Sequence, residues 1–187
     1  MRILLFGGSK FMGLDLLIKL SKIENSEIFV INRGKIHWNG LFYELVKSNK
    51  NIYHFISDRN NDTQFKTTLN QIKELISKSF QSLSENPVYF DYIIDFSCFA
   101  EDDAKIVLEE FTKLFKFYIF ISTDSVYNAS NISLERNEEF FLSKEDLTLI
   151  ESVREEEGYL SESSEGRKKL KKRDRYGYDK LKCERVF

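Results

Sequence analysis

The sequence is poor in the residues that build disulfides and metal sites. It has two cysteines, Cys98 and Cys183, and two histidines, His37 and His54. The cysteines are far apart and lack metal-type spacing, and no acidic cluster adjoins either histidine, so we predict neither a disulfide framework nor a zinc site. We interpret both histidines as surface or packing residues. Cysteine usage this low suits a reducing cytoplasm.

Excess charge and long apolar runs are also lacking. A formal net charge of -2 produces no field that would require a nucleic acid or an anionic membrane as partner. The apolar run 14–20 is interrupted by Asp15 and Lys19, and no run approaches membrane-spanning length. No basic region precedes an apolar stretch at the N-terminus. We therefore expect a cytoplasmic protein that is not secreted and has no membrane partner.

What the sequence does have is an alternation of strand and helix patterns. The short apolar run Ile3–Phe6 is ended by two glycines, which is typical of a strand buried on both faces of a parallel sheet. Similar strand candidates are 27–31, 52–56, 92–96 and 117–121, and helix candidates are 11–20, 63–80 and 104–115. This alternation predicts an α/β fold with a doubly wound parallel sheet of the Rossmann type.

Beyond Tyr127 the sequence becomes highly charged. Acids dominate 135–157, and Arg167–Arg173 is a dense basic run. We interpret 128–175 as a long charged, partly mobile excursion within one domain that spans 1–187. A basic run of this kind can contact RNA, although a solvated loop paired with its own acidic neighbour is the favoured interpretation.

A glycine-rich turn, FGGSKFMG at positions 6–13, follows the first strand candidate. Such a turn between the first strand and the first helix of a parallel sheet lets backbone N–H groups approach a pyrophosphate closely. It is not a Walker loop, because no Gly-Lys-Ser/Thr ends it. The alternative is a tight turn without a ligand. The residues predicted to bind a dinucleotide here are Gly7, Gly8, Ser9, Lys10, Phe11, Met12 and Gly13.

The residues after the second strand bear on the choice of cofactor. An acid at that point would hydrogen-bond the ribose 2′-OH of NAD, whereas this sequence has Asn32 and Arg33. Lys10 and Arg33 favour NADP over NAD, because a cation can pair with the additional phosphate. The alternative is that both cations simply point to water.

The turn FGGSKFMG resembles the Gly-Gly-Thr-(Gly or Arg)-Phe-(Leu or Ile)-Gly turn of extended and atypical short-chain dehydrogenase/reductases. This superfamily includes the nucleotide-sugar epimerases and dehydratases. Gly7 and Gly13 match its outer glycines, and Lys10 stands at the middle glycine. A subgroup with arginine there includes chloroplast stem-loop RNA-binding relatives.

The resemblance implies further cofactor contacts at two other strand ends. Asp58 follows the third strand, where superfamily members often have an Asp that meets the adenine, and Arg59 adjoins it. Phe96 and Ser97 end the fourth strand and are expected to line the same cleft. For Asp58 and Arg59 the alternative is a turn-forming Asp beside a solvated Arg.

The resemblance also implies a catalytic set. The segment Ser122–Tyr127 resembles the Ser-Ser-x-x-Val-Tyr segment of extended members and places the catalytic Ser/Thr at Thr123, with Ser125 as the second choice. Tyr176 and Lys180 have the family's Tyr-x-x-x-Lys spacing, which puts both on one helix face. Lys180 would favour the phenolate of Tyr176, which would take a proton from the substrate hydroxyl while hydride passes to the nicotinamide.

The function implied by the resemblance is that of an NAD(P)-dependent epimerase, dehydratase or reductase domain that acts on a nucleotide sugar or similar small alcohol and works as a homodimer. Extended members continue into a C-terminal substrate lobe, which we expect this chain to lack. It would then be a fragment, or a shortened member that relies on a partner. The alternative from another class is a non-catalytic nucleotide-binding module that interacts with RNA.

Overall fold

The computed structural model describes residues 1–35, 40–79, 88–129 and 160–187. These residues form two compact units. Unit 1 comprises Met1–Cys98 and Lys105–Ile121, and unit 2 comprises Phe99–Ala104 and Ser122–Phe187. His37 lies outside the described residues. No helix in the described part of the chain is long and apolar enough to cross a membrane.

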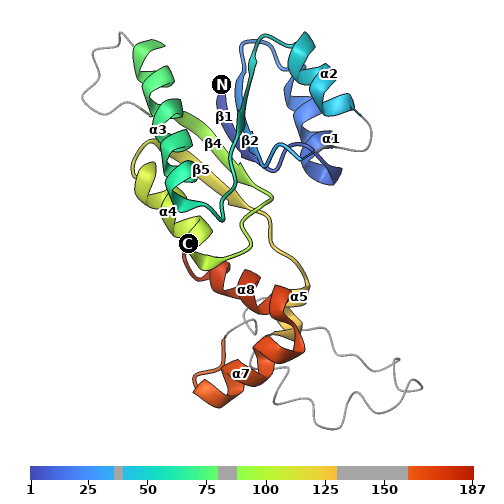
Figure 1. Cartoon of the computed structure of the whole chain (residues 1–187), viewed down its shortest axis with the longest axis vertical. Helices are drawn as coiled ribbons and strands as arrows, with labels where there is room; N and C mark the ends of the chain where they lie inside the picture. Colours follow the sequence, from blue (N-terminus) through green and yellow to red (C-terminus); the bar gives the residue numbers. More distant parts are fainter. Residues whose placement is uncertain (36–39, 80–87, 130–159) are drawn as a thin grey trace. The chain divides into compact units, whose positions relative to one another are not determined.

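Unit 1 is built on a sheet of five parallel strands in the order β3-β2-β1-β4-β5 (Figure 1). Because β1 pairs with both β2 and β4, the strand order reverses direction at the centre of the sheet. This order confirms the predicted doubly wound, Rossmann-type fold. The strands are β1 (Arg2–Phe6), β2 (Glu27–Asn32), β3 (Ile52–Ile56), β4 (Phe90–Asp95) and β5 (Phe115–Phe120).

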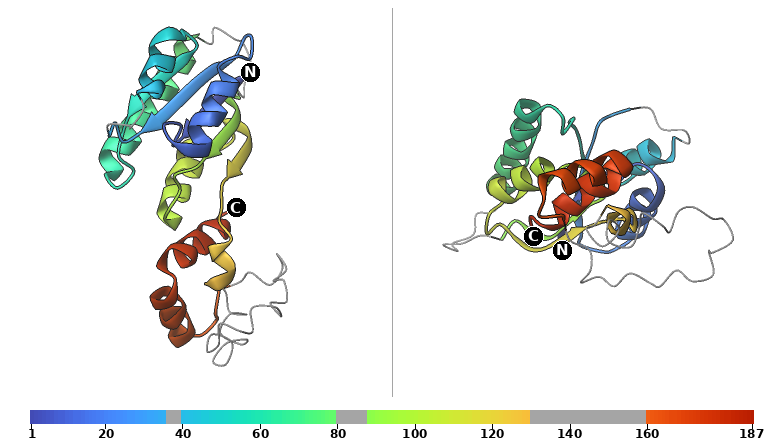
Figure 2. Two further views of the ribbon diagram at one scale, coloured as in Figure 1. Left: turned by 90° about the vertical axis from the view of Figure 1, so that its right-hand side faces the viewer. Right: turned by 90° about the horizontal axis from the view of Figure 1, so that it is seen from below.

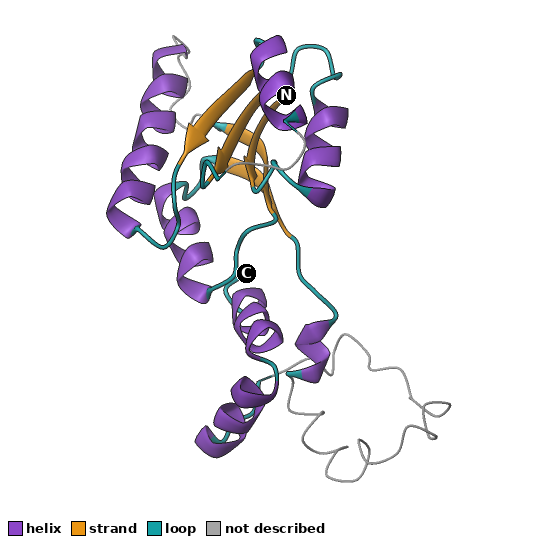
Figure 3. Ribbon diagram, turned by 45° about the vertical axis from the view of Figure 1, so that its right-hand side comes forward, coloured by secondary structure: helices purple, strands orange, loops and turns teal. Residues whose placement is uncertain are grey.

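Helices cover both faces of this sheet (Figure 3). Successive strand residues point to opposite faces, so the apolar β1 supplies two cores. Leu4 and Phe6 pack on the side of α3 and α4, whereas Ile3 and Leu5 pack on the side of α1 and α2. The helices are α1 (Phe11–Leu20), α2 (Leu41–Ser48), α3 (Asp62–Ser79) and α4 (Glu101–Glu110), whose residues from Lys105 on belong to unit 1.

Two features of unit 1 differ from the sequence-based expectation. The eight-residue helix α2 was not predicted. The helix predicted over 104–115 begins earlier and ends at Glu110, because Lys113 takes a positive φ of 63° in the turn that leads into β5. Phe111 lies just beyond the helix end and is fully buried in the core.

Unit 2 contains α5 (Ser125–Asn128), α7 (Ser164–Arg173) and α8 (Arg175–Glu184) (Figure 2). Ser163 caps α7 by accepting a hydrogen bond from Gly166 N, and Asp174 caps α8 by accepting one from Gly177 N. Helix α7 thus occupies part of the predicted excursion 128–175, of which 130–159 lie outside the described residues.

One acid of the sheet, Asp91, is expected to make the stability of the fold depend on pH. Asp91 in β4 accepts hydrogen bonds from Lys116 Nζ at 2.6 Å and from Arg2 N at 2.8 Å. These contacts, the Lys116 bond foremost, lower the pKa of Asp91. Its stabilisation is therefore present above the pKa of the unfolded chain and is lost as the pH falls through the folded-state value.

We expect Asp91→Asn to lower the free energy of unfolding by about 1 kcal/mol at pH 6 and by clearly less at pH 3. Urea unfolding of variant and wild type at both pH values measures this difference. Asp15→Asn is the matched control, because Asp15 pairs with Lys19 on the exposed surface of α1 and should matter little at either pH. An equal loss at pH 6 and pH 3 would show that the charge of Asp91 does not stabilise the fold.

Candidate functional site

The glycine turn between β1 and α1 is shaped by two close approaches. Gly7 has a φ of +88°, in the region that favours glycine. A Cβ on Gly7 would lie 3.2 Å from Cβ of Phe96 and 3.4 Å from Cβ of Ser97, so the end of β4 packs directly on the turn. A Cβ on Gly13 would overlap the carbonyl oxygen of Gly7. The turn and the first turn of α1 can therefore approach this closely only with glycine at position 13.

The start of α1 is open to solvent. Lys10 is the N-cap residue with extended backbone and makes no side-chain cap, and its own side chain is exposed. Phe11 and Met12 are 74% and 65% exposed, whereas Ser9 is buried. The first N–H groups of a helix have no intrahelical partners and carry partial positive charge. Together with Lys10 they make this end of α1 suitable for a phosphate group.

Two buried polar atoms at the neighbouring strand ends have no hydrogen-bond partner among the described residues. They are Nδ2 of Asn32, at the end of β2, and Oγ of Ser57, just after β3. Both side chains are at least nine-tenths buried, and Ser57 N donates to Asn32 O at 2.9 Å, so they are adjacent. A buried donor left unsatisfied costs about 1–3 kcal/mol. A polar ligand at this edge would remove that cost.

The other amide atom of Asn32 is already occupied. Its Oδ1 accepts from Gly34 N at 2.9 Å and lies 3.1 Å from His54 Nε2. The amide is therefore held in one orientation, with Nδ2 as the atom left for a ligand. Arg33, the next residue, is exposed.

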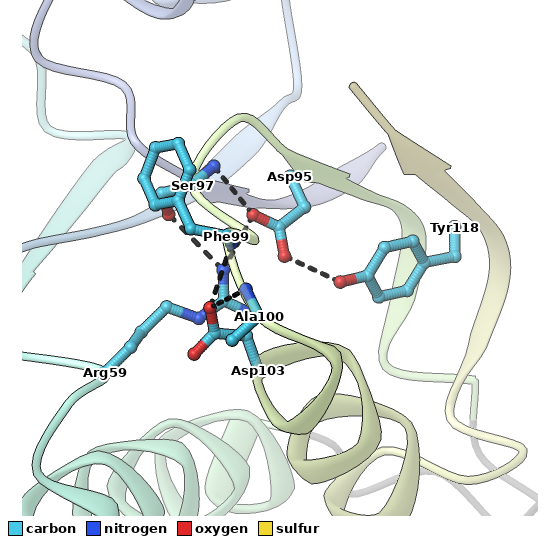
Figure 4. A network of polar contacts seen from close by, with 7 residues as sticks. All are labelled: Arg59, Asp95, Ser97, Phe99, Ala100, Asp103 and Tyr118. Atoms are coloured by element: carbon cyan, nitrogen blue, oxygen red, sulfur yellow. Dashed lines mark hydrogen bonds and ion pairs between the residues drawn. The ribbon is translucent and has the colours of Figure 1, made fainter. Parts of the chain in front are cut away.

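The end of β4 carries a buried ionic network (Figure 4). Asp95 is fully buried, and its Oδ1 accepts from Arg59 Nη1 at 2.8 Å and from Ser97 N at 2.9 Å. Its Oδ2 accepts from the Tyr118 hydroxyl at 2.7 Å. Burial, followed by the charge of Asp95, raises the pKa of Tyr118, so this hydroxyl stays protonated and donates. The network fixes the backbone that packs on the glycine turn.

This network changes the interpretation of Asp58 and Arg59. Arg59 is buried, and its guanidinium carbon lies 4.5 Å from the centroid of the Phe6 ring, so Arg59 is not a solvated side chain. Asp58 does form a turn, because its Oδ1 accepts from Asn60 N at 3.1 Å. Asp95 was not predicted from the sequence, in which it is one of two acids, with Asp91, in the otherwise apolar and aromatic strand β4.

The predicted catalytic residues all lie in unit 2. Tyr176 on α8 is 48% exposed, whereas Lys180, one turn later, is 1% exposed. Thr123 lies just before α5, and its hydroxyl donates to Asp124 Oδ1 at 3.2 Å and accepts from Ser125 N at 3.3 Å.

The helices α5 and α8 pack closely enough to bring these segments together. A Cβ on Gly177 would overlap the carbonyl oxygen of Ser125, so the residue after Tyr176 touches the segment that carries Thr123. Tyr178, the other tyrosine of this segment, is buried against Ala129 and Leu170. Of the two tyrosines, Tyr176 is therefore the one available to a substrate.

Two further polar contacts hold α8 in unit 2. Glu101 Oε2 lies 2.5 Å from Lys182 Nζ, and this hydrogen bond raises the pKa of Lys182. Ser122 Oγ donates to Glu184 Oε1. In the described part of the chain, no group of three or more His, Cys, Asp or Glu residues could hold a metal ion.

No protein-family model and no curated protein matches the sequence. Solved structures do match the fold. A dTDP-glucose 4,6-dehydratase from Bacillus anthracis in complex with NAD is 18% identical with a TM-score of 0.57, and the match covers 100% of this chain and 49% of that one. A UDP-glucuronic acid 4-epimerase from Bacillus cereus in complex with UDP-glucuronic acid and NAD is 18% identical with a TM-score of 0.56, covering 100% and 51%.

Vestitone reductase from alfalfa is 15% identical with a TM-score of 0.57, and the match covers 99% of this chain and 50% of that one. The chain thus spans about half the length of these three proteins. At such low identities the similarity shows a shared fold.

Proposed function

We propose that the chain binds a nicotinamide dinucleotide at the carboxyl edge of the unit 1 sheet, with NADP preferred over NAD. The observation that carries this proposal is the pair of buried polar atoms without partners, Asn32 Nδ2 and Ser57 Oγ. Asn32 lies next to the glycine turn, because Gly7 N donates to the carbonyl of Ile31, and Ser57 adjoins Asn32 through the hydrogen bond from its backbone N–H. Lys10 and Arg33 are exposed cations at the same edge and would pair with the additional phosphate of NADP.

We further propose that the chain is the cofactor-binding part of an epimerase, dehydratase or reductase that acts on a nucleotide sugar or similar small alcohol. The shared fold supports this proposal, since two of the similar structures are a nucleotide-sugar dehydratase and a nucleotide-sugar epimerase in complex with NAD. A bound nicotinamide would supply the hydride acceptor.

Three residues of unit 2 would carry out the proton transfer at the substrate hydroxyl. Tyr176 would remove the hydroxyl proton as general base, and Thr123 would hold the oxygen by a hydrogen bond. Lys180 lies one turn along α8 from Tyr176, and its ammonium would supply the positive charge that accompanies this proton transfer.

The cofactor preference is tested by Asn32→Asp, which changes charge with little change of shape. The aspartate carboxylate can still accept the hydrogen bond from Gly34 N. It also places a negative charge beside the proposed binding position of the additional phosphate of NADP. We expect the affinity for NADPH to fall at least tenfold and that for NADH to be retained or to rise, since a charge-assisted contact is worth about 1.5–3 kcal/mol. Titration calorimetry with each cofactor measures both.

The matched control is Asn49→Asp, an asparagine at the C-terminal end of α2, which should leave both affinities unchanged. Equal losses for NADPH and NADH in Asn32→Asp would show that position 32 does not distinguish the two cofactors.

A basic surface on α7 keeps the second candidate function open to experiment. Lys168, Lys171 and Lys172 are exposed and have no carboxylate partner among the described residues. RNA binding by this surface remains a prediction of the sequence, as do a homodimer and a cytoplasmic location.

A further inference from the structure

An aromatic ring from outside α8 contacts both members of the proposed acid/base pair. The ring centroid of Phe99 lies 6.3 Å from that of Tyr176, at an interplanar angle of 46°. The same centroid lies 5.2 Å from Lys180 Nζ, within the range of a cation–π contact. All three residues belong to unit 2.

The backbone of Phe99 is held on both sides. Asp103 Oδ2 accepts hydrogen bonds from Phe99 N and from Ala100 N, each at 2.9 Å (Figure 4). Two residues after Phe99, Glu101 pairs with Lys182 on α8. These contacts hold the segment that carries Phe99 to the start of α4 and to α8. The Phe99 ring is therefore fixed against α8, the helix that carries Tyr176 and Lys180.

Lys180 is buried, so contact with the Phe99 ring can stabilise its ammonium. Its side chain is 1% exposed, and burial disfavours the charged form of a lysine. The face of an aromatic ring attracts a cation, most strongly where water is excluded. Phe99 itself remains 50% exposed, so its ring is not explained as part of the apolar core.

We propose that Phe99 is a positioning residue of this site, whose ring holds the Lys180 ammonium and the Tyr176 ring in one arrangement. The proposal rests on the proposed function only in taking Tyr176 and Lys180 as the acid/base pair. Its physical content, that Phe99 stabilises a buried ammonium, stands without any cofactor or substrate.

The experiment compares Phe99→Leu with Phe99→Trp. Leucine keeps an apolar side chain beside Lys180 but removes the aromatic ring. Tryptophan keeps an aromatic ring whose face can contact the Lys180 ammonium. The titration of the Lys180 side chain is followed by ¹⁵N NMR of lysine-labelled protein, with Lys180→Met to assign the signal. We expect the pKa of Lys180 to fall by about one unit in Phe99→Leu, a tenfold change in its protonation equilibrium, and to stay near the wild-type value in Phe99→Trp.

Phe117→Leu is the matched control, because Phe117 is a ring of similar exposure, 58%, in unit 1 and its loss should leave Lys180 unchanged. An unshifted Lys180 in Phe99→Leu, or equal shifts in Phe99→Leu and Phe99→Trp, would overturn the proposal. Because no cofactor is added, either result is separate from a failure of the chain to bind NADPH, which would overturn the proposed function instead.

Discussion

Asp95→Asn is expected to lower the free energy of unfolding by about 3 kcal/mol, because it removes the charge of a carboxylate buried against a guanidinium. Asp95 is fully buried, and it accepts hydrogen bonds from Arg59, from Ser97 N and from the Tyr118 hydroxyl. Asparagine has nearly the same volume, so no cavity contributes to the loss. Urea unfolding at pH 7, followed by circular dichroism, measures the change.

Tyr118→Phe is the matched control for this network. It removes one hydrogen bond to Asp95 and leaves the ion pair with Arg59 in place, so a loss of about 1 kcal/mol is expected. If Asp95→Asn costs no more than Tyr118→Phe, the charge of Asp95 does not stabilise the fold.

Gly13→Ala is expected to weaken NADPH binding about 100-fold. The added Cβ would overlap the carbonyl oxygen of Gly7 and lie 3.1 Å from its carbonyl carbon, so the turn and α1 must move apart. The N–H groups of the two segments would then no longer converge on one pyrophosphate. The loss of one or two charge-assisted hydrogen bonds, each worth about 1.5–3 kcal/mol, accounts for the expected factor.

Gly40→Ala separates this steric effect from the general cost of replacing a glycine. Gly40 has a φ of +62°, and nothing lies within 4 Å of a Cβ built on it. We expect a modest loss of stability and unchanged affinity for NADPH, measured by thermal unfolding and calorimetry. Wild-type affinity in Gly13→Ala would show that the glycine turn does not bind the cofactor.

The sheet was predictable from sequence because each strand is a short apolar run. Ile3–Phe6 is buried on both faces of the sheet. In a sequence where short apolar runs alternate with helix patterns, such a run followed by glycines indicates a strand of a parallel sheet. Helix α2 was not predicted because it has eight residues and one buried side chain, Phe42, to mark its inner face.

The candidate site was predictable where it depends on position along a strand. Asn32 lies at a strand end, and the sheet order places it beside the glycine turn. Asp95 and Phe99 were not predictable, because their roles depend on partners far along the chain. Asp95 meets Arg59, 36 residues away, and Phe99 meets two residues of α8. No local spacing encodes such contacts.

Calorimetric titration of the chain with NADPH and with NADH examines the proposed dinucleotide site at the carboxyl edge of the unit 1 sheet without any substitution. We expect NADPH to bind at least tenfold more tightly than NADH and to raise the temperature of unfolding, since a ligand that binds only the folded state stabilises it. Absence of binding by both cofactors at millimolar concentration would contradict it.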